Sequence, residues 1–421
     1  MNLLKKINLR NYLFIFLVVN TIYYLFWRHP LYEKLLFLNN LHDVFNIFTI
    51  FIIISHLGNI KMLFKQLRSV RYAVIFFIIF FIYIFISFVV YDFTAIKAQR
   101  FHITGTLLIL GVVALISKKE INHSLFDFYT FYKIQAITII IMGGLRALDV
   151  LPMYYGEESY SKLRFINNYQ ALSLVIYFIF HVYMHKYKAK NLKFNNFLAA
   201  FSFLAVLAST QRAVTFAFGF FLIFFIFYHR KYLFKNVGYI LLLFLLFITT
   251  LDYREIYETL HYALYERIFV QTESSHGYNK FQDILAGIEY ILNNQLYLGR
   301  LFQLEYFERA RGGFYSPASR GFHNLFIVYF ISGGFLLIIP YILLWLREFL
   351  VHLRFIFTKY TKHNKELSKM AFWLMFVTFF VVNSTAQPTI AALTITPCIV
   401  VELFNKQIIS HGKSIYHYKI S

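Results

Sequence analysis

The feature that most constrains this chain is its succession of long apolar runs separated by short polar connections. A helix needs about 20 mostly apolar residues to cross the hydrocarbon core of a membrane. With 59% hydrophobic residues, the chain has too little polar surface for a water-soluble globule of this size. The sequence therefore predicts an all-α fold, a polytopic transmembrane bundle of about twelve spans. The predicted spans are 11–27, 35–56, 72–91, 103–117, 125–146, 169–185, 194–209, 212–228, 234–251, 323–346, 370–385 and 388–404.

Basic residues dominate the connections between these runs and give the chain a net charge of +21. A nucleic-acid-binding protein gathers its basic residues on one folded face, whereas here they are scattered, so nucleic acid is not expected as a partner. Of the 41 Lys and Arg residues, 25 fall in alternate connections, which the positive-inside rule places in the cytoplasm. Both termini are therefore predicted to be cytoplasmic. No small-residue cleavage site follows the first run, which is predicted to be an uncleaved first helix.

One polar segment, 251–322, interrupts the apolar pattern after nine predicted spans. The topology places it on the outer side of the membrane, since long loops translocate largely regardless of their charge. The chain is thus predicted to have three parts: a transmembrane bundle (1–250), an extracytoplasmic helical loop (251–322), and C-terminal spans with a cytoplasmic tail (323–421). Apolar residues at helical spacing predict a helix over 281–292 within the loop.

Candidate functional residues lie where this polar segment passes into the next apolar run. A loop rich in Gly, Ser and Pro, 309–320, suits a lid over a substrate and equally an inert connector. His323 follows it, and the neighbouring Asn324 can orient an imidazole or a sugar hydroxyl by hydrogen bonding. The pair Gly333-Gly334 permits close helix packing. Arg212 opens another predicted span, where a guanidinium either anchors the helix at the membrane rim or grips a phosphate group, and both interpretations stay open.

Together these features resemble the bacterial O-antigen polymerase and O-antigen ligase superfamily. The resemblance rests on the number of spans, a Ser-Thr-Gln-Arg turn at 209–212, a large outward segment with a turn at Leu298-Gly299, and His323-Asn324 opening a helix that contains Gly333-Gly334. It covers roughly residues 209–345. It implies a metal-independent glycosyltransferase without a cofactor, which takes a glycan from undecaprenyl diphosphate on the outer face of the bacterial inner membrane. Its partners would be this lipid-linked donor, a glycan or lipid A-core acceptor, and membrane lipid.

The resemblance also implies roles for individual residues. Three are expected to be catalytic: His323, Arg212 and Arg267. Three are expected to bind substrate: Asn324, Arg254 and Arg320. An imidazole is a suitable general base for the acceptor hydroxyl, and arginines at the diphosphate stabilise the charge that develops in the transition state. No metal-binding residue is expected.

Other functions compete with this prediction. A polymerase joins the glycan to another lipid-linked repeat unit of O-antigen or a related surface polysaccharide, whereas an O-antigen ligase transfers it to lipid A-core. A polysaccharide transporter or flippase also fits a dozen spans. That class predicts inverted repeats and interrupted helices that meet at the membrane midplane, and no such repeat is visible in the sequence.

Overall fold

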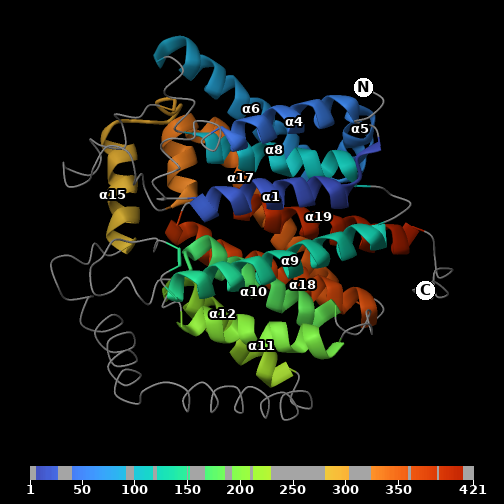
Figure 1. Ribbon diagram of the computed structural model, residues 1–421. Helices are drawn as coiled ribbons and strands as arrows, with labels where there is room; N and C mark the ends of the chain where they lie inside the picture. The colour runs from blue at the N-terminus through green and yellow to red at the C-terminus, as the bar shows by residue number, and fades with distance from the viewer. Residues whose placement is uncertain are drawn as a thin grey trace.

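The structure, a computed structural model, is built entirely from α-helices in the part of the chain that it describes. Most of the helices lie side by side in one bundle, with α15 apart at one end of it (Figure 1). The described residues are 6–26, 40–91, 99–116, 121–148, 150–151, 166–184, 192–208, 212–228, 280–302, 324–358, 362–385 and 388–410. The helices in these ranges are α1 (Leu9–Phe26), α4 (Leu41–Ser55), α5 (Leu57–Gln66), α6 (Arg68–Tyr91), α8 (Arg100–Leu115), α9 (Ile121–Ala147), α10 (Asn168–Met184), α11 (Leu192–Ala208), α12 (Arg212–Tyr228), α15 (Lys280–Asn293), α17 (Leu325–Phe357), α18 (Lys362–Thr385) and α19 (Pro388–Ser410).

The predicted all-α class is confirmed for the described ranges. Each predicted span in these ranges contains a helix, and the run 234–251 lies outside them. Helix is the expected outcome for such runs, because an apolar medium offers the backbone no other hydrogen-bonding partners. The helix predicted over 281–292 corresponds to α15.

Length and hydropathy identify four helices in the described ranges that can cross a membrane, namely α6, α9, α17 and α19. The pair α4 and α5 is a fifth candidate, although the two helices are bent by 71° at their junction. The apolar parts of α1, α8, α11 and α12 are shorter, and at 1.5 Å per residue they reach at most about 26 Å, less than the hydrocarbon thickness of about 30 Å. The count of about twelve spans and the outward side of 251–322 therefore stay predictions.

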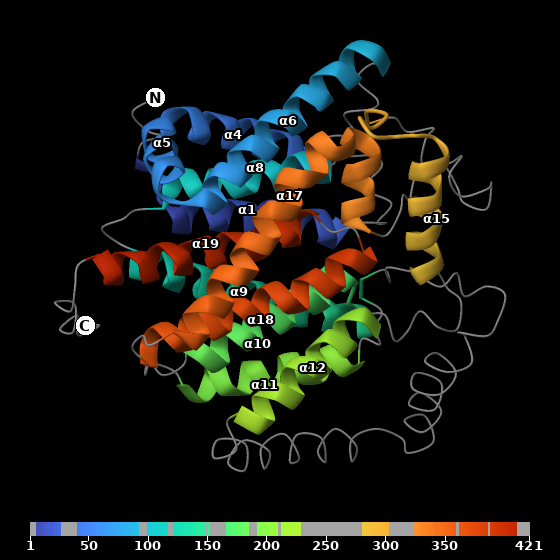
Figure 2. The same cartoon turned by 180° about the vertical axis from the view of Figure 1, so that it is seen from behind.

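Contacts between helix termini define two opposite ends of the bundle. At one end of the bundle, Tyr23 near the end of α1 packs against His42 at the start of α4, with 5.0 Å between ring centres. At the opposite end, Ser69 at the start of α6 donates a hydrogen bond to Glu402 near the end of α19. We name the first end, where α17 begins, the Asn324 end, and the second the Glu402 end. In Figure 2, α15 and the start of α17 lie at the Asn324 end.

The central helix of the bundle is α19. Its apolar stretch is entirely buried, and it packs against α8, α9, α17 and α18. Polar side chains connect it to α18, since Thr394 accepts a hydrogen bond from Thr378 and Asn405 donates one to Ser368. The outer helices instead expose apolar side chains, such as Phe85 of α6. Buried polar contacts together with an exposed apolar surface are what a membrane-embedded bundle requires.

Glu402 is the centre of an ion cluster at the end that bears its name. Its carboxylate is fully buried and lies 3.2 Å from Nη2 of Arg347 and 3.0 Å from Nζ of Lys406. Its second oxygen accepts the hydrogen bond from Ser69 Oγ, at 2.6 Å. Because Ser69 belongs to α6 and Arg347 to α17, this one carboxylate joins three helices.

The Glu402→Gln variant is expected to be less stable by about 1–3 kcal/mol, because an anion facing two cations is lost. The side chains of Arg347 and Lys406 are 29% and 35% exposed, so they can extend to the membrane surface and limit the cost. Thermal denaturation of the detergent-purified protein, followed by size-exclusion chromatography, measures the effect. Arg354→Gln is the control, since Arg354 is exposed in the last turn of α17. Equal melting temperatures for the two variants would contradict the prediction.

Candidate functional site

A sharp break at Gly334 divides α17 into two parts. Gly334 has φ 56° and ψ −152°, which is not helical. Before the break, Phe326 packs against Tyr341 and Trp345, with 5.4 Å and 6.2 Å between ring centres. In one straight helix, Phe326 and Tyr341 would be about 22 Å apart. The segment Leu325–Gly333 therefore folds back on the helix that follows, whereas the sequence predicted a single span over 323–346.

The first part of α17 runs across the bundle at the Asn324 end, alongside α15 (Figures 1 and 2). Side chains of α15 and of the turn that follows it, Ile291 and Leu296, form a small apolar cluster with Ile327, Val328 and Ile331 of α17. This cluster fixes α15 against the folded-back segment.

The turn after α15 enters the break in α17 and binds it through backbone groups. The amides of Arg300 and Leu301 each donate a 2.9 Å hydrogen bond, to the carbonyl groups of Ile331 and Ser332, and the amide of Phe335 donates one of 2.8 Å to the carbonyl of Tyr297. The first two bonds are accepted by carbonyl groups of α17 at the break, and in the third α17 donates an amide there.

Glycine is required on both sides of this contact. Gly299 has φ +77°, and a Cβ on it would lie 2.5 Å from the Gly334 nitrogen. A Cβ on Gly334 would lie 2.1 Å from the Tyr297 carbonyl oxygen. The sequence suggested Leu298-Gly299 as a turn and Gly333-Gly334 as a site of close helix packing. The structure brings the two together, with a turn rather than a second helix against the glycine pair.

Helix α6 holds the same turn from the other side. The hydroxyl of Tyr83 donates a 2.7 Å hydrogen bond to the carbonyl of Leu298, and Ser87 Oγ accepts one of 3.0 Å from the amide of Phe302. The turn is therefore fixed between α6 and α17, and its position determines where the start of α17 lies.

Asn324 is the N-cap of α17. Its Oδ1 accepts hydrogen bonds from the amides of Phe326 and Ile327, at 2.9 Å and 3.2 Å. An N-cap satisfies amides that have no partner within the helix. This contact gives Asn324 a structural role whether or not it also binds substrate.

Asn324→Ala is expected to destabilise the protein by about 0.5–2 kcal/mol, because the cap is lost. Asn324→Asp should retain the wild-type melting temperature, since Asp caps as well as Asn and its charge suits a helix N-terminus. Melting temperatures in detergent measure both effects. The Asp variant also separates the two roles, because lost activity at unchanged stability would mean that the substrate needs the Asn324 amide.

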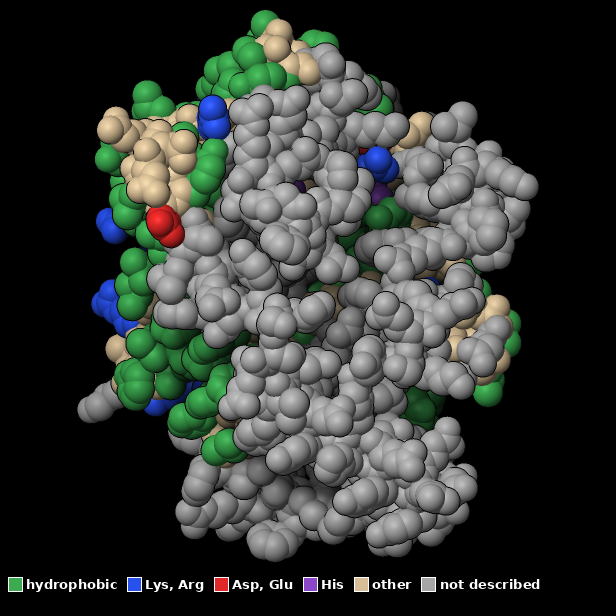
Figure 3. Space-filling model, turned by 90° about the vertical axis from the view of Figure 1, so that its left-hand side faces the viewer, with side chains coloured by type: hydrophobic (Ala, Val, Ile, Leu, Met, Phe, Trp, Pro, Cys, Tyr) green, Lys and Arg blue, Asp and Glu red, His purple; other side chains and the backbone are tan. Residues whose placement is uncertain are grey.

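Two histidines, the buried His42 and the partly buried His102, lie near the start of α17. His102 of α8 packs edge-on against Tyr329, with 5.4 Å between ring centres, and His42 of α4 packs against Phe101, at 5.1 Å. Neither ring nitrogen of His42 has a hydrogen-bond partner among the described residues. Arg100, the first residue of α8, is close enough to His42 to act on it electrostatically. Figure 3 shows the molecule from the side on which α15 lies, and Lys and Arg side chains (blue) and His side chains (purple) are visible on this side.

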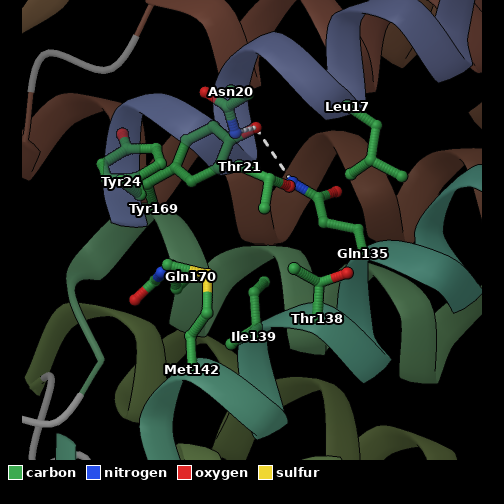
Figure 4. Close-up of a pocket in the computed structure, with 10 residues that line it drawn as sticks. All are labelled: Leu17, Asn20, Thr21, Tyr24, Gln135, Thr138, Ile139, Met142, Tyr169 and Gln170. Atoms are coloured by element: carbon green, nitrogen blue, oxygen red, sulfur yellow. Dashed lines mark hydrogen bonds between the residues drawn. The ribbon is translucent and has the colours of Figure 1, made fainter. Parts of the chain in front are cut away.

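A small cavity lined by both polar and apolar side chains lies between α1, α9 and α10 (Figure 4). The hydroxyl of Tyr169 accepts hydrogen bonds from Asn20 at 3.0 Å and Gln135 at 2.9 Å. The space open to the centre of a water molecule is about 10 Å³, roughly what one water needs. Near it, the buried Arg146 at the end of α9 donates a 2.8 Å hydrogen bond to the carbonyl of Tyr24. The Asn324 end thus buries a cation as well as neutral polar groups.

The structure describes only part of the predicted site. Asn324 is placed with its side chain. Arg212 is the first residue of α12, and for Arg212 the backbone alone is described. The paired rings of α10 and α12, such as Phe178 with Phe218 at 5.2 Å, place the start of α12 beside the start of α10, at the Asn324 end. The other candidates lie outside the described residues: His323, Arg254, Arg267 and Arg320.

Sequence reasoning missed three residues at this end, the buried His42 and Arg146 and the partly buried His102. A signal was available, because an ionisable residue within an apolar run is costly and marks a functional position by default. Among the described residues, no group of three or more His, Cys, Asp and Glu is placed to hold a metal ion.

The fold and this site define a polytopic helical membrane protein with a turn docked into a broken helix at one end of its bundle. Comparison of the sequence with protein-family models finds no match, and comparison with curated proteins finds none either.

Proposed function

We propose that this protein is a membrane glycosyltransferase that polymerises undecaprenyl-diphosphate-linked repeat units of O-antigen or a related surface polysaccharide. The observation that carries the proposal is the contact between the Leu298-Gly299 turn and the Gly333-Gly334 break. These are two of the motifs on which the resemblance rests, and they are far apart in the sequence. Their contact fixes Asn324, and the residue before it is His323.

The N-terminus of α17 suits an anionic substrate. A helix N-terminus carries a partial positive charge and attracts phosphate groups, and Arg212 begins α12 at the same end of the bundle. In the proposed bacterial host, this end faces the outer side of the inner membrane, where the lipid-linked donor is available. The lipid tail of the donor would lie against the apolar outer surface of the helices.

In the proposed reaction, a hydroxyl oxygen of the acceptor attacks the anomeric carbon of the donor glycan. A new glycosidic C–O bond forms while the bond between the anomeric carbon and the diphosphate oxygen breaks. His323 takes the hydroxyl proton as general base. The bonding electron pair leaves with undecaprenyl diphosphate, whose charge Arg212 and Arg267 stabilise. Asn324, Arg254 and Arg320 are proposed to hold the glycan and the diphosphate in place.

Arg212→Lys is expected to lower glycan transfer about tenfold or more, because an ammonium group cannot make the bidentate contact of a guanidinium with phosphate. Polymer formation in a deletion strain that carries the variant gene measures the loss, with membrane-protein abundance as the control. If Lys supports transfer as well as Arg, Arg212 is an anchor at the membrane rim.

One structural feature favours a transporter as the second candidate. Broken helices are typical of secondary transporters, and α17 is broken while α4 and α5 meet at a bend. In transporters, however, such breaks line a substrate cavity. Here the backbone of Tyr297–Leu301 fills the break in α17, which supports the glycosyltransferase.

The decisive experiment is a gel of surface polysaccharide from the deletion strain, with and without the wild-type gene. A polymerase predicts loss of the long ladder, with one repeat unit still attached to the core. Bare core with glycan accumulating on the lipid carrier would mean an O-antigen ligase. Glycan accumulating on the cytoplasmic side would mean a flippase, and unchanged O-antigen and capsule would refute all three.

A further inference from the structure

Beside the ion cluster of Glu402, the bundle holds a second group of ionisable residues. The proposed glycan transfer involves none of them. Glu348 and His352 lie one turn apart on α17, and both side chains are fully buried. Oε2 of Glu348 and Nε2 of His352 are 3.2 Å apart. A carboxylate and an imidazole at this distance must share a proton, since neither a carboxylate oxygen nor a bare ring nitrogen is a donor.

The cations nearest to Glu348 are paired with another carboxylate, and besides His352 only Ser69 of α6, among the described residues, acts on the Glu348 carboxyl group as a hydrogen-bonding side chain. Arg347 and Lys406 both pair with Glu402, which is itself close enough to Glu348 to repel a negative charge there. Oε1 of Glu348 and Nδ1 of His352 are buried and have no hydrogen-bond partner among the described residues. An ionised carboxylate in such surroundings is costly unless it is paired, so a proton is the ligand that the pair can hold at least cost.

Other titratable groups on the adjoining helices set the field around the pair. Cys398 of α19 is buried and interacts electrostatically with Glu348. On α18, Glu366 and Lys369 form an ion pair of their own, at 2.8 Å. Arg68 begins α6, next to Ser69. The charge of Glu402 is already balanced by Arg347 and Lys406. A proton bound inside the bundle at this end would therefore be held by the Glu348–His352 pair.

We propose that Glu348 and His352 form a proton-binding site within the membrane-embedded bundle, in which the His352 ring passes a proton to the Glu348 carboxylate. A proton arriving at Nδ1 of neutral His352 releases the proton of Nε2 to Oε2 of Glu348. The net change is one proton bound, and no bond between heavy atoms forms or breaks. Chains of Glu and His within membrane segments act as proton relays in this manner. The site lies at the end opposite to Asn324 and is independent of the proposed glycan transfer.

Infrared difference spectroscopy on the full-length protein in nanodiscs, titrated with pH, tests the proposal. The wild type should show the carbonyl band of a buried, protonated carboxylic acid, and its amplitude should fall about tenfold for each pH unit above the midpoint. Glu348→Gln should abolish this band. His352→Gln should move its midpoint by about one pH unit or more. Glu289→Gln is the matched control, because Glu289 is an exposed carboxyl group on α15, and it should leave the band unchanged.

A band that persists in Glu348→Gln, or the absence of any titrating band in the wild type, would overturn the proposal. A measurement on the wild type keeps the test independent of how well the variants fold. Dicyclohexylcarbodiimide reacts with protonated carboxyl groups in apolar surroundings, and mass spectrometry locates the adduct. Modification at Glu348 that decreases with rising pH supports the site, whereas no modification at Glu348 at any pH refutes it.

Discussion

Gly334→Ala is expected to release the turn at Leu298-Gly299 from α17. A non-glycine residue at φ 56° and ψ −152° is strained by about 1–3 kcal/mol, and the new methyl group would overlap the Tyr297 carbonyl oxygen, 2.1 Å away. That oxygen belongs to the backbone of a turn that α6 holds in place, so it cannot move without breaking hydrogen bonds. We expect a local cost of at least about 3 kcal/mol.

Hydrogen–deuterium exchange with mass spectrometry measures this effect directly. The amides of Arg300, Leu301 and Phe335 donate the bonds of the junction, and in the variant they should exchange about 100-fold faster. Gly219→Ala is the control, since a Cβ on Gly219 of α12 meets nothing within 4 Å and alanine favours a helix. Unchanged protection at the three amides in Gly334→Ala would show that the junction does not depend on glycine.

His323→Ala is expected to abolish formation of the long-chain polysaccharide while the protein remains in the membrane at wild-type abundance. Loss of a general base lowers a rate by about 10²–10⁴-fold, enough to remove the ladder from a gel. The measurement is complementation of the deletion strain with wild type or variant. The variant should accumulate the same lipid-linked intermediate as the deletion.

His123→Ala is the matched control for this experiment. His123 is an exposed histidine near the start of α9, at the Glu402 end, and its loss should leave the ladder intact. A full ladder with His323→Ala would refute the proposed general base. Gly334→Ala tests the same site from the structural side, because an undocked turn no longer fixes Asn324 and the residue before it.

Apolar runs proved a good guide to where helices form. In an apolar medium the backbone has no alternative to internal hydrogen bonds, so runs such as 388–404 became helices whatever their neighbours. The amphipathic spacing of 281–292 predicted α15 for a different reason, since one face of that helix meets α17 through Ile291. Helix existence was therefore readable from local sequence.

The arrangement of the helices was not readable in the same way. In a membrane bundle, the faces toward lipid and toward other helices are both apolar, so the apolar pattern does not show which way a helix faces. Ionisable residues such as His42 and Arg146 mark positions that face inward, but the local sequence does not show which helices they meet. The run 323–346 likewise fits a straight span as well as a folded-back one. Gly333-Gly334 predicted a close approach, but its partner is a turn more than thirty residues away, and only the tertiary structure brings them together.

The central position of α19 bears on how this protein is made. Of the described helices, α19 is the last to leave the ribosome, yet it occupies the middle of the bundle. Until it arrives, Thr378 and Ser368 of α18 and Ser69 of α6 lack the partners that α19 supplies. Domains generally fold from the N-terminus during synthesis. Before α19 is made, this bundle lacks its central helix, so the earlier helices must remain loosely associated in the lipid. The described bundle is therefore complete only when α19 has inserted among the helices that precede it in the chain.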